Sequence, residues 1–184
     1  MTKSSLATPA QVLDFWFGAG PKKWYAKDDA FDAEIRTRFL ATYQAAAAGQ
    51  LADWEAAPDS ALALTIVLDQ FSRNMFRGSA RTFAADATAL AVAKHAVERG
   101  FDQQLELTRR NFFYLPFMHS ENLADQERCV AHSREAGDPN TLKYAELHRD
   151  IIRRFGRFPH RNPVLGRVTT PEEQAFLDAG GFAG

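Results

Sequence analysis

The sequence contains a single cysteine, Cys129, and has no run of about 18 apolar residues. One cysteine cannot form an internal disulfide, which favours a reducing compartment. The missing apolar run excludes a transmembrane helix. The first residues, MTKSSLATPAQ, also lack the apolar core of a signal peptide. We therefore expect a cytoplasmic protein without a membrane partner.

A charge excess of one sign is missing as well. The chain has 22 basic and 23 acidic residues, and its formal net charge is -1. Such a balance argues against binding to nucleic acid. The motifs G-x-x-x-x-G-K-[ST], G-x-G-x-x-G, H-E-x-x-H and G-x-S-x-G do not occur. We expect no cofactor, no metal and no nucleic-acid partner.

Strand-like alternation of apolar and polar residues is also lacking, and each apolar segment has helical spacing. Several helix starts carry clear caps, of which the capping boxes at Thr8 and Thr170 are the plainest. Pro116 is expected to kink its helix or to end it early. The predicted helices run from Thr8 to Gly18, Asp28 to Gly49, Asp59 or Ser60 to the turn near Gly78, about Phe83 to Gly100, about Gln104 to Ser120, Asn122 to Gly137, Asp138 to Gly156, and onward from Thr170.

These helices predict an all-α fold. Short turns between them favour a tetratricopeptide-like array of about eight antiparallel helices. The unit from Leu123 to Gly156 has the 34-residue length of a tetratricopeptide repeat, although the consensus residues of that repeat are missing. We expect residues 1 to 7 to be a disordered lead-in and residues 8 to 184 to form a single domain. Arrays of this kind have a concave face, and concave faces bind other molecules.

The stretch from Ser60 to Phe83 combines an apolar helix with a basic end. One face carries Leu64, Leu68, Phe71 and Met75. The candidate ligand-binding residues on its other faces and just beyond it are Asp69, Gln70, Arg73, Asn74, Arg77 and Arg81. Guanidinium groups grip carboxylates and phosphates, so these arginines predict half of an anion pocket. The alternative is that they are helix-end cations with a local pair between Asp69 and Arg73.

A second candidate is the segment FFYLPFMHSE, residues 112 to 121. His119 and Glu121 follow a proline-interrupted aromatic helix and are candidates for an acid–base pair. The alternative is that His119 bonds to a helix end. His148 is a further catalytic candidate, but it leans toward the apolar face of its helix and is more typical of a satisfied core histidine.

The third candidate is the basic and aromatic segment RRFGRFPHRN, residues 153 to 162. Its candidate ligand-binding residues are Arg157, His160, Arg161 and Asn162. One interpretation is a rigid loop that packs its phenylalanines and presents its arginines to a groove. The other is a solvated helix end followed by a structured loop. Single-stranded nucleic acid is disfavoured because the rest of the chain is neutral.

Five blocks of the sequence are distinctive, namely VLDFWFG, WYAKDDAFD, LDQFSRNMFRG, LPFMHSE and FGRFPHRNPVLGR. Taken together, they resemble the bacterial domain of unknown function 924 family, over about residues 10 to 178. The resemblance implies an all-α, tetratricopeptide-like fold, but no established activity. The positions of this chain that match the polar motif residues are Asp69, Gln70, Arg73, Asn74, Arg77, His119, Glu121, Arg157, His160, Arg161 and Asn162.

Three hypotheses for the function follow. The first is a protein that binds a small anion, or a peptide with a carboxylate, in a groove to which the three polar blocks contribute. The second is a protein-interaction scaffold, which predicts an exposed apolar patch. The third is a hydrolase in which His119 or His148 is the base, Glu121 orients it and arginines hold the substrate.

Overall fold

The computed structural model describes residues 6 to 182, and this part of the chain contains helices and no β-strand. The predicted all-α class is confirmed, and eight of the α-helices have eight or more residues. The α-helices are α1 (Pro9–Ala19), α2 (Pro21–Trp24), α3 (Asp29–Ala47), α4 (Pro58–Ile66), α5 (Ser72–Met75), α6 (Asp86–Glu98), α7 (Leu107–Met118), α8 (Leu123–Ala136), α9 (Pro139–Phe155) and α10 (Pro171–Asp178). The shorter elements are the 3₁₀ turns η1 (Ala52–Ala56), η3 (Ala80–Phe83), η4 (Asp102–Gln104) and η5 (Pro159–Arg161), and the π-helical segment η2 (Val67–Phe71).

The helix starts that carry a polar cap lie where the sequence predicts them. Thr8 and Thr170 each form a complete capping box. The side chain of Asp28 accepts two backbone N–H groups at the start of α3, and Asn122 does the same at the start of α8. Each of these side chains satisfies donors that the first helical turn leaves unpaired, which stabilises its helix by about 1 kcal/mol.

Other predicted boundaries are wrong by a few residues. The third helix begins at Pro58, ahead of Asp59 and Ser60, because a proline at the first position has no N–H that needs a cap. The fourth begins at Asp86, since residues 80 to 83 form a 3₁₀ turn. Pro116 lies inside α7, which ends two residues later at Met118.

The described residues form two compact units. The first contains the chain through Arg77 together with Arg81–Pro116, and the second contains Gly78–Ala80 and the chain from Phe117 onward. The single domain predicted from residue 8 onward and the tetratricopeptide-like arrangement stay predictions. Residues 1 to 5 of the predicted lead-in lie outside the described part, and the backbone N–H of Ala7 donates to Thr42 at 2.9 Å.

In the first unit, the helical stretch from α4 through η2 to α5 is buried almost all round. The predicted stripe of Leu64, Leu68, Phe71 and Met75 is at most 3% exposed. Burying a side chain of this size contributes about 1.5–3 kcal/mol. The ring of Phe71 packs edge-on against Trp16 and Phe15 of α1, at centroid distances of 5.7 and 6.1 Å. This stretch is therefore the centre of the first unit.

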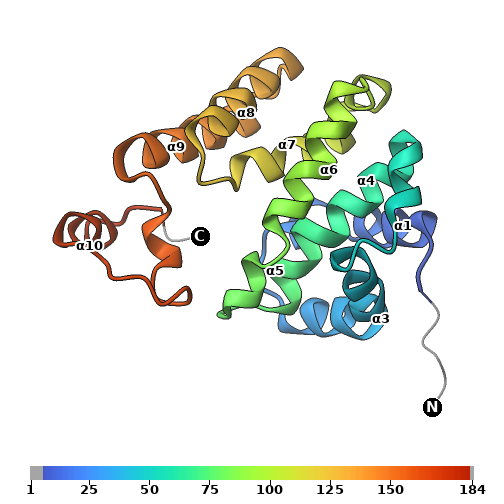
Figure 1. The fold of residues 1–184 in the computed structure, drawn as a ribbon, viewed down its shortest axis with the longest axis horizontal. Coiled ribbons are helices and arrows are strands. Elements are labelled where there is room, and N and C mark those ends of the chain that lie inside the picture. The colour runs from blue at the N-terminus through green and yellow to red at the C-terminus, as the bar shows by residue number, and fades with distance from the viewer. Residues whose placement is uncertain (1–5, 183–184) are drawn as a thin grey trace. The chain divides into compact units, whose positions relative to one another are not determined.

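In the second unit, α8 and α9 lie side by side (Figure 1). Gly137, in the left-handed conformation at φ 75°, ends α8 and allows the sharp turn into α9. Cys129 of α8 is fully buried, and burial raises the pKa of its thiol to about 12, so it packs as a small apolar residue. A loop returns from α9 to α10, whose Phe176 packs on Phe155 with centroids 5.2 Å apart.

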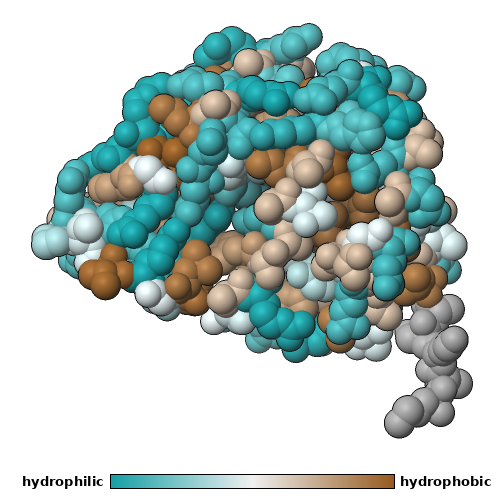
Figure 2. All heavy atoms as spheres, viewed as in Figure 1, coloured by the Kyte–Doolittle hydropathy of each residue, from teal (hydrophilic) through white to brown (hydrophobic). Residues whose placement is uncertain are grey.

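The surface is mainly polar where it is drawn in Figure 2. On that face, hydrophobic residues form small groups among hydrophilic ones. Exposed large apolar side chains include Tyr25, at 68%, and Val168, at 85%. No helix among the described residues has the length and apolar character that crossing a membrane requires.

Candidate functional site

Arg73, in the first unit, lies between two carboxylates. Its two terminal nitrogens donate to Asp86 at 3.0 and 3.1 Å, and Nη1 lies 3.2 Å from Oδ1 of Asp69. Asp69 is 1% exposed, and its Oδ2 accepts from Gln70 at 2.6 Å. The Asp69–Arg73 pair is the local pair that the structural interpretation of these arginines predicts. Asp69, Gln70 and Arg73 thus join η2 to the first turn of α6.

Asn74 and Arg77 turn toward α3 instead. Nδ2 of Asn74 donates to Oδ1 of Asp32 at 2.7 Å, and the Arg77 guanidinium donates to both oxygens of the same carboxylate. Nη2 of Arg77 also donates to the carbonyl of Ala26 at 3.2 Å. Arg77 is therefore held in one orientation while its side chain stays 36% exposed. Arg81 has a different environment, since its guanidinium lies 4.0 Å from the ring centroid of Phe76.

An open hollow of about 540 Å³ adjoins the Asp32–Arg77 pair. The residues that line it come from α3, from the chain just before α3, and from α5 and the turn after it, and they are Lys27, Asp29, Asp32, Ala33, Arg36, Thr37, Asn74 and Arg77. Among residues 6 to 182, neither Lys27 nor Arg36 has a carboxylate partner. One N–H of Arg36 donates to the carbonyl of Met75, which leaves four further donors on that side chain. The hollow therefore presents two cations that form no ion pair with a protein carboxylate, and its lining of three cations and two carboxylates has a net charge of +1.

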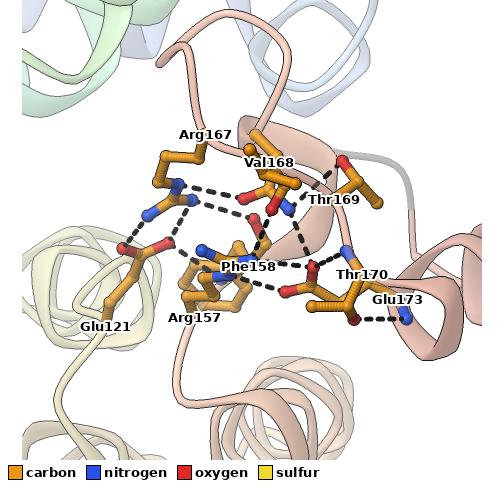
Figure 3. Close-up of polar contacts among 9 residues, drawn as sticks. Glu121, Arg157, Phe158, Arg167, Val168, Thr169, Thr170 and Glu173 are labelled. Atoms are coloured by element: carbon orange, nitrogen blue, oxygen red, sulfur yellow. Dashed lines mark hydrogen bonds and ion pairs between the residues drawn. The ribbon is translucent and has the colours of Figure 1, made fainter.

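In the second unit, Glu121 is paired with an arginine that the sequence interpretation did not single out. Arg167 donates to Oε2 of Glu121 at 2.6 Å and to Oε1 at 2.9 Å (Figure 3). Oε1 also accepts the backbone N–H of Phe158 at 2.8 Å. Burial raises the pKa of Glu121, but these hydrogen bonds outweigh it and the pKa is lowered. As the orienting group of a histidine base, Glu121 would first have to release Arg167.

Arg157 points to a buried carboxylate, that of Glu173 (Figure 3), and Asn162 contacts the same carboxylate. Arg157 donates to its two oxygens at 2.6 and 2.8 Å, and Asn162 donates to Oε2 at 3.1 Å. The Thr170 N–H donates to the same Oε2 at 2.8 Å as part of the capping box. The hydrogen bond from Arg157 lowers the pKa of Glu173 to about 2, against the effect of burial. This network ties residues 157 to 170 to α10.

Two histidines of the second unit, His148 and His160, each pack against Phe158 and Phe182. His148 is 6% exposed, and its Nδ1–H donates to the carbonyl of Tyr144 at 2.8 Å. Burial, assisted by the nearby His119, His160 and Arg161, lowers its pKa to about 3. Burial also lowers the pKa of His160 to about 4. His148 therefore has the environment of a satisfied core histidine.

Of the three polar blocks, two lie in the second unit. There, Nη2 of Arg161 donates to the carbonyl of His119 at 3.0 Å, so the segment after Pro116 and the late loop are in direct contact. The block with Arg73 and Arg77 belongs to the first unit. A groove shared by all three blocks stays a prediction.

Several residues of these sites were not recognised from the sequence, among them the carboxylate partners Asp32 and Asp86. Lys27 and Arg36 complete the hollow, and Arg167 and Glu173 complete the two ion pairs of the second unit. Arg36 follows Asp32 by one helical turn, and this spacing places the two on the same face of α3. Arg167 and Glu173 pair with residues far away in sequence, which no local pattern indicates.

Residues 12–181 match the sequence model of the family DUF924, described as bacterial protein of unknown function, and the chain belongs to this family. It is similar to a solved structure, that of the protein of unknown function ATU0120 from Agrobacterium tumefaciens. The two sequences are 48% identical, the match covers 94% of this chain and 97% of the other, and the TM-score is 0.91. No curated protein matches the chain.

Proposed function

We propose that this member of the DUF924 family binds a small anionic ligand, or a peptide through a carboxylate, in the hollow between α3 and the end of α5. The observation that carries the proposal is the pair of cations without carboxylate partners, Lys27 and Arg36. An incoming carboxylate would supply the charge that the protein does not. Hydrogen bonds between charged partners contribute about 1.5–3 kcal/mol each, enough for selective binding of a small molecule.

The fixed guanidinium of Arg77 supports the same proposal. Because Asp32 and the Ala26 carbonyl hold Arg77, little side-chain entropy is lost when a ligand makes contact with it. Asp32 also balances the charge of Arg77, so Arg77 would contribute hydrogen-bond donors in a fixed orientation more than net charge. The attracting charge in the proposed site is that of Lys27 and Arg36.

Asp29 limits the negative charge that a ligand of this hollow can carry. This carboxylate lines the same hollow and, among the described residues, has no cation within ion-pair distance. It would repel a ligand with several negative charges. The proposal therefore favours a monocarboxylate or a peptide C-terminus over citrate or a polyphosphate.

The test is a thermal-shift titration of the full chain with N-acetyl-dialanine and with its C-terminal amide, beside succinate, citrate and inorganic phosphate. We expect stabilisation by the peptide acid and none by the amide. Arg36→Met should weaken the binding by at least about tenfold, which corresponds to about 1.4 kcal/mol.

Lys143→Met is the matched control, because Lys143 is an exposed lysine of α9 in the second unit and does not line the hollow. It should bind the peptide acid as the unmodified protein does. Equal binding by Arg36→Met, Lys27→Met and the unmodified protein would overturn the proposal.

A further inference from the structure

A second hollow in the first unit lies between the end of α1 and the start of α3, and its volume is about 350 Å³. It is lined by Asp14, Phe15, Gly18, Ala19, Lys23, Phe31 and Glu34. We propose that it binds a small organic cation, a primary ammonium that carries an aromatic or aliphatic body. This site is separate from the proposed anion site, and its ligand has the opposite charge.

Two stacked rings form the apolar part of this hollow. The centroids of Phe15 and Phe31 are 5.3 Å apart, and their planes differ by 10°. Phe31 is 3% exposed, and Phe15 is held from behind by Phe39 at 5.0 Å. Phe31 is also stacked on Trp16, at 6.1 Å, so the half-buried Phe15 supplies the apolar surface that a ligand can reach. The face of an aromatic ring carries the negative part of the quadrupole.

The protein already places its own cations over these rings. Nζ of Lys23 lies 5.2 Å from the centroid of Phe31, and the guanidinium carbon of Arg38 lies 4.5 Å from that of Phe15. The side chain of Lys23 is 49% exposed, and its contact with Asp28 is long, at 3.9 Å. Lys23 is thus weakly held and can give way to a ligand ammonium in the hollow.

The charges at the rim favour a cation. Glu34 is paired with Arg38 at 3.0 Å. Asp14 has no ion pair within the described chain. With Lys23 displaced toward Asp28, Asp14 is the unbalanced charge of the hollow. A ligand ammonium beside Asp14 would restore neutrality while its apolar body covers Phe15.

Gly18 leaves the hollow open on the side of α1. It lies within the helix, and a Cβ built on it would meet no atom within 4 Å. A larger residue is therefore accommodated there without backbone strain, and its side chain would fill space that the ligand needs. Gly18→Leu is a blocking variant, and Gly18→Ala changes the same backbone position while leaving most of the space.

The test is a titration of the ¹⁵N-labelled full chain with 2-phenylethylammonium, followed by the amide signals of Gly18 and Ala19. The anionic isostere 3-phenylpropionate and the neutral 2-phenylethanol are titrated in parallel. We expect saturable shifts with the ammonium alone, retained in Gly18→Ala and weakened at least about tenfold in Gly18→Leu.

The charge variants make the test sharper. Asp14→Asn should weaken binding of the ammonium by about two- to fivefold, and Lys23→Met should strengthen it by a similar factor, because it removes the internal competitor. Asp53→Asn is the control, since it removes an exposed carboxylate of the same unit outside the hollow. Equal binding of the three probes, or undiminished binding by Gly18→Leu, would overturn the inference.

The outcome is independent of the anion site. Arg36→Met should leave the affinity for 2-phenylethylammonium unchanged, and Gly18→Leu should leave the affinity for the peptide acid unchanged. Loss of both ligands in either variant would contradict two separate sites.

Discussion

The carboxylate of Glu121 accepts hydrogen bonds from both terminal nitrogens of Arg167, at 2.6 and 2.9 Å, across 46 residues of sequence. The same guanidinium donates to the Asn162 side chain at 2.9 Å and to the Phe158 carbonyl at 3.1 Å. Arg167 therefore connects the segment after α7 to the loop that follows α9. A residue distant in sequence, Glu121, therefore helps to fix the conformation of this loop.

Replacing Arg167 should destabilise the second unit. Arg167→Met leaves the Asn162 side-chain oxygen and one Glu121 oxygen without the donor that Arg167 supplies, and we expect a loss of about 2–3 kcal/mol in the free energy of unfolding. The measurement is urea denaturation at pH 7. Arg154→Met removes the exposed pair with Glu172, whose side chains are 51% and 67% exposed, and it should cost at most about 0.5 kcal/mol. Similar losses in the two variants would contradict this role of Arg167.

Acid should weaken the fold through Glu173. Its pKa is about 2 in the folded chain and near 4.5 when unfolded, so the unfolded state binds more protons between these values. The stability that Glu173 contributes is therefore present above about pH 4.5 and is lost as the pH falls toward 2. Glu173→Gln keeps an acceptor for the Thr170 cap but loses the charge that Arg157 pairs with. We expect a lower stability at pH 7 and a flatter decline between pH 5 and 3.5, measured by urea denaturation.

A second pH dependence should appear at milder acidity. His148 has a folded pKa of about 3 against 6.5 when unfolded, so its neutral form stabilises the fold above pH 6.5 and this stability decreases as the pH falls. Burial opposes its protonation, and so do the nearby His119, His160 and Arg161. The loss between pH 7.5 and 5 should be about 2 kcal/mol from this residue. His148→Leu should reduce the pH slope in that interval, and an unchanged slope would show that His148 is not its source.

The C-terminal segment should be sensitive to one methyl group. A Cβ on Gly181 would lie 2.6 Å from the ring and the backbone oxygen of Phe176. Gly181→Ala must therefore move the chain and carry Phe182 away from His148, whose ring centroid lies 4.5 Å from that of Phe182. We expect a loss of about 1–2 kcal/mol and a change in the ring-current shift of His148 in proton NMR. Gly18→Ala is the control, because its added Cβ meets open space.

Local signals in the sequence predicted the helices well. Thr8, Asp28, Asn122 and Thr170 each bond to backbone groups within three residues, so the sequence alone contains both partners. The start of α4 was misplaced because Pro58 needs no polar cap, and the 3₁₀ turn before Asp86 was missed because it leaves no periodic pattern.

The candidate sites were less predictable, because their partners come from different parts of the chain. Asn74 and Arg77 were recognised as polar positions, but their attachment to Asp32 depends on how α5 packs on α3. Lys27 and Arg36 resemble ordinary surface cations in the sequence. Only the packed unit shows that both lack a carboxylate partner and line the same hollow.

The π-helical segment Val67–Phe71 determines how the helical stretch from α4 to α5 responds to a change in chain length. Its wider turn holds an extra residue, and each residue of an α-helix advances the side-chain direction by about 100°. Deleting one residue within this segment would leave a regular α-helical turn and keep Asn74 and Arg77 directed toward Asp32. The same deletion within α4 would turn every later side chain of the helix by about 100° and carry Asn74 and Arg77 away from Asp32.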